Sequence, residues 1–190
     1  MTTLKECYSL KFYENGSDIW FGDFNEDDCF RIEKSKIYQL IKTYGIKSVE
    51  FILSRLAVDT HADNKILFIE AKKSLQKQDY IDISQKFMDS LQLSSAISLG
   101  IHKKRAVLPK NIACFFEQGG QIIFILVVKD CGKEQTQQLK NMEEAIKRQL
   151  LKEYKIWKFI VRAIKEETAK NENIVTTFPQ TLIHTPVILF

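Results

Sequence analysis

Two charged residues stand at the end of an apolar run in the segment 65–72, whose sequence is KILFIEAK. Four consecutive apolar residues predict a buried strand, and Glu70 and Lys72 follow at its end. Residues two apart on a strand point to the same face of the sheet, so these two side chains are expected to lie side by side. An unpaired charge is expensive to bury. A carboxylate and an ammonium at the end of a core strand therefore indicate a site that does chemistry.

A second carboxylate is within reach of the first. The segment 48–53 is another apolar run, and Glu50 lies at its start. If the two runs form an antiparallel hairpin that turns near Thr60, Glu50 falls directly opposite Glu70. Directly opposed residues share a face, with Cβ atoms about 5 Å apart. Glu50, Glu70 and Lys72 are therefore the candidate catalytic residues.

This arrangement resembles the PD-(D/E)XK nuclease superfamily, in which an acid precedes apolar residues and an apolar strand then ends in Glu-x-Lys. The matching residues are Glu50, Glu70 and Lys72, and the resemblance covers about residues 30–130. The first acid here is Glu after Val rather than the usual Asp, and 43–47 leaves little room for the strand that usually precedes it. The resemblance implies a restriction-endonuclease-like fold and hydrolysis of phosphodiester bonds in DNA with Mg²⁺ or Mn²⁺.

The resemblance also implies roles for individual residues. Glu50, Glu70 and the backbone carbonyl of Ala71 would hold the metal ion, which prefers hard oxygen ligands. Glu33, on the first helix, would be a further ligand. Lys72 would contact the attacking water and stabilise the negative charge of the phosphate.

Nucleic-acid contacts are predicted in two further places. The basic patch Lys103, Lys104 and Arg105 could contact phosphates, whose binding is largely electrostatic, although a solvated loop is an equally good interpretation. Gln85, on the helix after the candidate site, could reach the site or the nucleic-acid backbone. The formal net charge of +4 and the isoelectric point near 8.8 permit nucleic-acid binding without requiring it.

Other interpretations of the same residues stay open. Glu-x-Lys occurs a second time at 153–155, inside a charged helical segment with no apolar strand before it. Glu70 and Lys72 could also be an exposed ion pair at a strand end, and such pairs contribute little to stability. With a different hairpin register, Asp63 would replace Glu50 as the first metal-binding acid.

Hydrophobic periodicity and turn signals predict the elements that position these residues. We expect a hairpin over 8–22 around an Asn-Gly turn, a helix over 29–44, the strand pair 47–55 and 65–73, and a helix over 80–99. Strands are predicted over 112–116 and 122–128, which makes strand, helix and strand a βαβ unit. One long amphipathic helix, or two with a break, is predicted over 134–169.

Together these elements predict one α/β domain over residues 1–190, with a nuclease-like core over about 29–130. A central mixed sheet would carry helices on both faces, and a long C-terminal helix would follow. The chain of 190 residues is 45% hydrophobic and 27% charged, which is ordinary for a globular domain. Its four cysteines are scattered, which favours reduced thiols over a disulfide framework or a zinc site.

The N-terminal residues lack the apolar core of a signal peptide, and the longest apolar run, 122–128, is too short to span a bilayer. We therefore expect a cytoplasmic protein without a membrane partner. The tail from residue 174 ends in the apolar sequence VILF, so the long helix and the tail could form a homodimer interface. The leading function is a metal-dependent nuclease acting on DNA. The alternatives are a nuclease-like binding module without catalysis and a structural oligomerisation protein.

Overall fold

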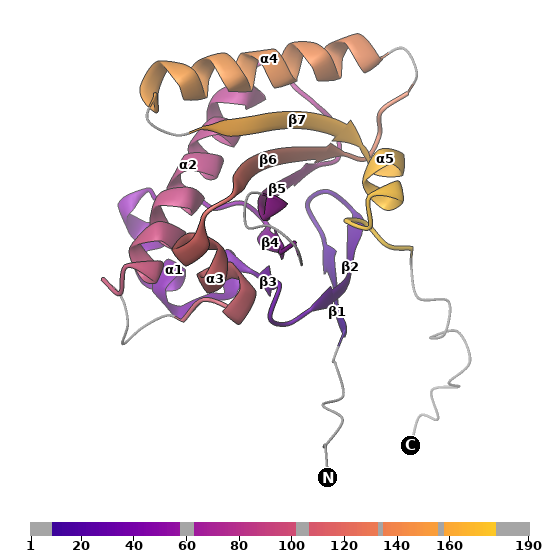
Figure 1. The fold of residues 1–190 in the computed structure, drawn as a ribbon. Helices are drawn as coiled ribbons and strands as arrows, with labels where there is room; N and C mark the ends of the chain where they lie inside the picture. Colours follow the sequence, from indigo (N-terminus) through magenta and orange to yellow (C-terminus); the bar gives the residue numbers. More distant parts are fainter. Residues whose placement is uncertain (1–8, 58–62, 102–106, 133–134, 156–157, 178–190) are drawn as a thin grey trace, which may run out of the picture.

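The computed structural model describes residues 9–57, 63–101, 107–132, 135–155 and 158–177 (Figure 1). Its strands are β1 (Ser9–Glu14), β2 (Ile19–Asn25), β3 (Cys29–Phe30), β4 (Phe51–Arg55), β5 (Lys65–Lys72), β6 (Gln121–Val128) and β7 (Phe159–Lys165). Its α-helices are α1 (Lys36–Ile41), α2 (Asp79–Ser98), α3 (Lys110–Gln118), α4 (Thr136–Glu153) and α5 (Glu166–Asn171). Two 3-10 turns, η1 (Ile32–Lys34) and η2 (Lys42–Tyr44), flank α1.

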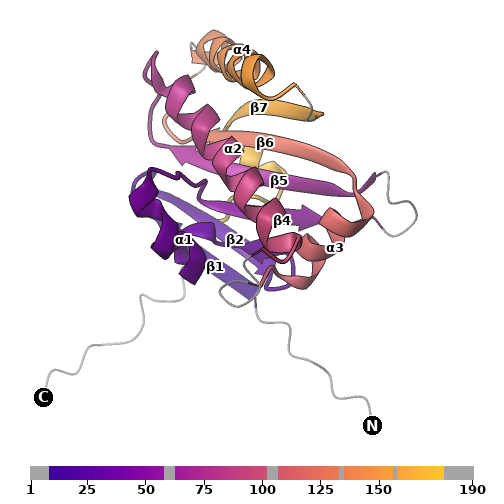
Figure 2. The same cartoon turned by 90° about the vertical axis from the view of Figure 1, so that its left-hand side faces the viewer.

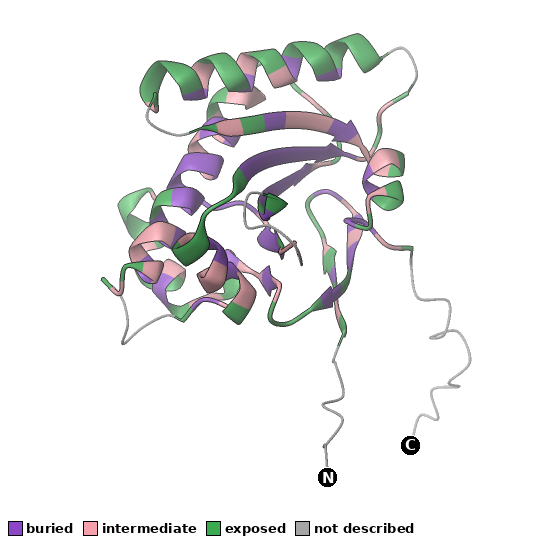
Figure 3. Cartoon of the chain, in the orientation of Figure 1, coloured by how far each residue is buried: buried purple, intermediate pink, exposed green. Residues whose placement is uncertain are grey.

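The described residues form an α/β fold around a mixed sheet with the strand order β3-β4-β5-β6-β7. Strands β5, β6 and β7 are parallel, whereas β4 runs antiparallel to β5 and β3 runs antiparallel to β4. The connection from β5 to the parallel strand β6 passes through α2 and α3, so a βαβ unit is present, with a second helix where a strand was predicted. Strand β6 lies between two parallel neighbours and is buried along almost its whole length (Figure 3), as expected for a strand covered on both faces.

Different elements cover the two faces of the sheet (Figures 1 and 2). Helices α1 to α4 pack on one face, where the ring of Phe87 stacks on Phe124 with centroids 4.8 Å apart. The hairpin of β1 and β2 covers the other face, where Phe12 and Phe21 lie 5.1 Å and 4.9 Å from the ring of Phe51. Among the described residues, the one helix that packs there is the short α5, through Ala169. The expectation of helices on both faces is therefore correct for one face and largely replaced by the hairpin on the other.

The segment 112–116 is helical, so the strand predicted there is wrong. Helix α3 begins after Pro109 and buries Ile112 and Phe115, which lie three residues apart on one side of it. A short apolar run fits a strand and a buried helix equally well by periodicity, and the spacing of these two residues decides for the helix. Gly119 ends α3 with a φ of +81°, a conformation that glycine adopts without strain.

The segment 134–169 is neither one long helix nor two helices with a simple break, because a strand lies between α4 and α5. Helix α4 ends at Glu153, and β7 follows as a strand that pairs in parallel with β6. The segment 159–165 carries Ile160, Val161 and Ile164, whose branched side chains fit a pleated sheet well. The parallel edge of β6 offers this segment a ladder of backbone hydrogen bonds, which outweighs the continuing helical periodicity of the sequence.

The helix predicted over 29–44 begins later than expected. Residues Cys29 and Phe30 pair with β4 instead, and α1 starts after Ser35, whose side chain accepts a hydrogen bond from the Tyr38 backbone N–H at 3.2 Å. The helical region ends at Gly45, as predicted.

Within the described residues, no helix combines the length and the apolar character needed to cross a membrane. The three cysteines in this part of the chain, Cys29, Cys114 and Cys131, are free thiols. The predicted homodimer interface comprises the long helix and the tail, and the apolar end of that tail lies within 178–190, outside the described residues.

Candidate functional site

Strands β4 and β5 pair in the register that the sequence predicts. Phe51 lies opposite Ile69, and the ladder continues to Arg55 opposite Lys65. Glu50 directly precedes β4, and its backbone N–H donates to the carbonyl of Ile69 over 3.0 Å. Glu50 therefore lies beside Glu70 at the end of the strand pair. Asp63 precedes the opposite end of β5, so Glu50 and not Asp63 lies beside Glu70.

Glu70 is fully buried and makes one strong contact. Its Oε1 accepts a hydrogen bond from the Nζ of Lys86 on α2 at 2.6 Å, and its side chain is 1% exposed. Within the described part of the chain, its Oε2 has no hydrogen-bond partner. A buried carboxylate oxygen without a partner is costly, and it is available to a cation.

Lys72 does not pair with Glu70. Its Nζ lies 3.9 Å from Oδ2 of Asp82, whose Oδ1 accepts a hydrogen bond from Lys47 at 2.7 Å. The ammonium that contacts the buried carboxylate belongs instead to Lys86, which was not predicted from the sequence. A signal for it exists, because Lys86 stands next to Phe87 and three residues after Ile83, both buried on the sheet-facing side of α2.

Side chains of α2 hold the chain segment that leads to Glu50. Asp89 accepts the backbone N–H of Lys47 at 2.8 Å, and the hydroxyl of Ser90 accepts that of Val49 at 2.9 Å. These two acceptors satisfy backbone groups that precede β4. Gln85, predicted to reach the site or nucleic acid, donates to Asp89 at 2.6 Å. Gln85 thus helps to orient the carboxylate of Asp89.

Burial and, to a smaller extent, neighbouring charges shift the pKa values of the carboxyl groups at the site. Burial, repulsion from Glu70 and then repulsion and hydrogen bonding with Glu14 raise the pKa of Glu50 from 4.5 to about 9. Burial raises the pKa of Glu70 to about 7, against the opposing effect of Lys86. Burial lowers the pKa of Lys86, but the nearby carboxyl groups raise it more, so the pKa lies above its usual value. These carboxyl groups belong to Glu70, Glu50 and Asp82. Both carboxyl groups therefore hold a proton more tightly than a glutamate exposed to water.

The carboxylate oxygens of Glu50 and Glu70 suit a hard divalent cation such as Mg²⁺. Two adjacent carboxyl groups that repel each other, one with a free oxygen, match the oxygen ligands that Mg²⁺ prefers. In the described chain, no group of three or more His, Cys, Asp or Glu side chains forms a metal-binding set. The side chains of Glu50 and Glu70 would therefore need oxygens from the backbone or from water to complete the coordination.

Of the remaining residues predicted for the site, Ala71 lies at it, Glu33 is not joined to it within the described residues, and the basic patch lies outside those residues. Ala71 is buried between Glu70 and Lys72 on β5, so its backbone belongs to the site. Glu33 lies in η1, and within the described residues no hydrogen bond or ion pair joins it to Glu50 or Glu70. The predicted phosphate contacts Lys103, Lys104 and Arg105 lie outside the described residues.

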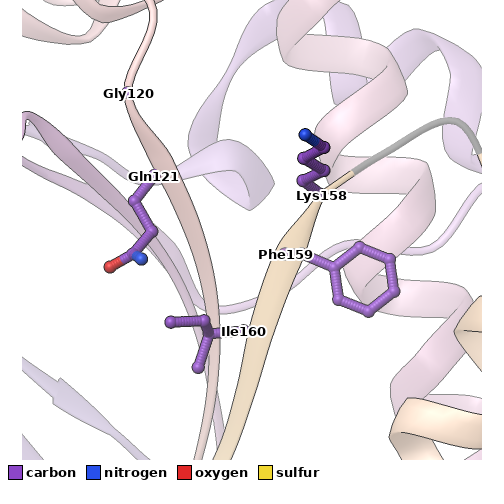
Figure 4. A pocket seen from close by; sticks show the side chains of 5 residues that line it. All are labelled: Gly120, Gln121, Lys158, Phe159 and Ile160. Carbon is purple, nitrogen blue, oxygen red and sulfur yellow. The ribbon is translucent and has the colours of Figure 1, made fainter. Parts of the chain in front are cut away.

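A hollow of about 440 Å³ lies at the other end of the parallel strands (Figure 4). Gly120, Gln121, Lys158, Phe159 and Ile160 line it. Gln121 is level with Lys65, five residues before Glu70 on β5, which is about 16 Å along a strand. This hollow has no carboxylate among its lining residues and is separate from the candidate site.

Comparison of the chain with protein-family models, with curated proteins and with solved structures found no match. A functional assignment therefore depends on the residues of the site and their geometry.

Proposed function

We propose that this protein is a metal-dependent nuclease of the PD-(D/E)XK type that hydrolyses phosphodiester bonds in DNA. The observation that carries the proposal is the placement of Glu50 beside the buried Glu70 at the end of the β4–β5 pair. Nothing in the packing of a strand end requires two repelling carboxyl groups there, and burying them is unfavourable. A cation that binds both would offset this cost.

Glu50, Glu70 and the backbone carbonyl of Ala71 would hold Mg²⁺ or Mn²⁺ at this position. When bound, the ion supplies electrostatic stabilisation of the charge that develops on the phosphate during hydrolysis. The 2.6 Å contact with Lys86 favours the ionised form of Glu70, against the larger opposing effect of burial on its pKa. The side chain of Lys72 is 29% exposed, and its contact with Asp82 is long at 3.9 Å. It is therefore the ammonium that can meet a phosphate arriving from solvent.

A binding module that keeps this scaffold without catalysis is the second candidate. The observation that favours it is the ion pair itself, because Lys86 already neutralises part of the carboxylate charge. Such a module would bind nucleic acid without any dependence on Glu70 or Lys72.

Cleavage of plasmid and single-stranded DNA by the purified full chain, with Mg²⁺ or Mn²⁺, separates the two candidates. The variants are Glu50→Gln and Glu70→Gln, which keep the side-chain volume and remove the charge. Glu153→Gln is the matched control, because it alters the second Glu-x-Lys of the chain, on the exposed side of α4. A nuclease loses cleavage in the first two variants and keeps it in the control. Absence of cleavage by the wild-type chain, or cleavage that survives in all three variants, would exclude the nuclease.

A further inference from the structure

A groove of about 410 Å³ lies between the start of α2 and the middle of α4, which pack together on the helical face of the sheet (Figure 2). Leu75, Tyr80 and Met142 give it an apolar floor, and side-chain amides, including that of Asn141, line its walls. Its size is within the usual range for a ligand site, about 300–1,000 Å³.

The charged side chains that line the groove are all positive. Lys77 and Arg148 line it, and no carboxylate is among its lining residues. Within the described residues, neither of these two cations forms an ion pair, in contrast to Lys47, Lys72 and Lys86 at the candidate site. The Nε of Arg148 donates to the Glu144 carbonyl at 3.2 Å. This leaves its two terminal nitrogens for an anionic partner.

The groove adjoins the candidate site across the first turn of α2. Leu75 and Lys77 belong to the short connection that leaves β5 after Lys72. Tyr80 and Asp82 are two residues apart on α2, so they point to nearly opposite sides of the helix. Asp82 contacts Lys72 on the site side, and Tyr80 lines the groove on the other. A chain of phosphates that passes the N-terminal end of α2 would connect the two.

We propose that this groove binds a single-stranded stretch of the nucleic-acid substrate beside the phosphate that is cleaved. This inference rests on the proposed nuclease function. Lys77 and Arg148 bind phosphates, and an unpaired base lies against Tyr80 over the apolar floor. Stacking of a base on an aromatic side chain contributes about 1–3 kcal/mol and tolerates any sequence.

Fluorescence anisotropy with a labelled 15-nucleotide oligo-dT tests the inference on the full chain. The titration is run in EDTA, so that no cleavage occurs, and at several salt concentrations. The test variant is the double substitution Lys77→Ala and Arg148→Ala. The matched control is Lys140→Ala with Lys147→Ala, which removes the same charge from exposed positions of α4 outside the groove.

The expected result is a loss of affinity of about tenfold or more in the groove variant and less than about twofold in the control. The slope of log affinity against log salt should fall by about 1.4 in the groove variant, because each lost phosphate contact accounts for about 0.7 on a single strand. Equal losses in both variants, tighter binding to a duplex of the same length, or no binding by the wild-type chain would overturn the inference. The Glu70→Gln cleavage assay is independent of these outcomes, so failure of the groove and failure of the nuclease are distinguishable.

Discussion

The Nζ of Lys86 lies 2.6 Å from Oε1 of Glu70, and this contact joins helix α2 to the end of strand β5. The side chains are 20% and 1% exposed, so the pair is shielded from water. Glu70 is tolerated in the core because Lys86 supplies the opposite charge, while its second oxygen stays without a partner among the described residues. Lys86 therefore holds one carboxylate oxygen of Glu70 in place, and the other oxygen can still accept a ligand next to Glu50.

Replacing Lys86 by Met should destabilise the fold by about 3 kcal/mol at pH 8, because breaking a buried ion pair leaves a charge without compensation. Urea denaturation of the variant and the wild type measures this difference. The double variant Lys86→Met with Glu70→Gln should recover part of the loss, since no unpaired charge remains.

Replacing Lys72 by Met is the matched control for this prediction. Its contact with Asp82 is 3.9 Å long and partly exposed, and such pairs contribute less than about 1 kcal/mol. An equal loss of stability in the two lysine variants would contradict the prediction that Lys86 is the residue that compensates the buried charge of Glu70.

Stability should fall with rising pH through the titration of Glu50. The pKa of Glu50 is raised in the folded chain from 4.5 to about 9, so the folded state holds this proton more tightly than the unfolded state. The resulting stabilisation is fully present below about pH 4.5 and is lost as the pH rises through about 9. Glu50→Gln does not titrate and lacks this dependence.

The free energy of unfolding of the wild type should therefore decrease relative to that of Glu50→Gln between pH 6 and pH 9. Denaturant titrations at several pH values measure the difference. Parallel pH profiles for the two proteins would show that Glu50 carries no raised pKa.

Ser90→Ala should cost about 1–2 kcal/mol, because the Val49 N–H loses its acceptor in a buried position. Ser94→Ala is the control. Ser94 is equally buried, but its hydroxyl only donates to the Ser90 carbonyl of its own helix. We expect its removal to cost less than about 1 kcal/mol in the same denaturation experiment. A Ser90→Ala variant as stable as Ser94→Ala would mean that α2 does not hold the segment before β4.

Local patterns in the sequence were sufficient to predict the strand pair and the helix that follows it. The register of β4 with β5 follows from two apolar runs and the number of residues between them, and α2 follows from apolar residues at helical spacing. The segments 112–116 and 159–165 could not be assigned in this way. Each carries an apolar pattern compatible with two structures, and contact with distant elements decides between them.

In the candidate site, too, some contacts follow from local sequence patterns and others depend on the packing of distant elements. Glu50 and Glu70 are adjacent in an antiparallel pair, so their proximity follows from the strand register. The contact of Lys86 with Glu70 depends on how α2 crosses β5, which no spacing within one element defines. For the same reason, the sequence placed Lys72 at the centre of the site, although the structure directs it toward Asp82.

Calorimetric titration of the full chain with Mn²⁺ at pH 8 is the most direct test of Glu50 and Glu70 as a cation site. The expected result is one ion bound per chain, with proton release that appears as a buffer-dependent heat, because Glu50 is protonated before the ion binds. Binding should be lost in Glu50→Gln and in Glu70→Gln and retained in Glu153→Gln. Absence of binding by the wild type, or binding unchanged in both glutamate variants, would contradict the assignment of this site.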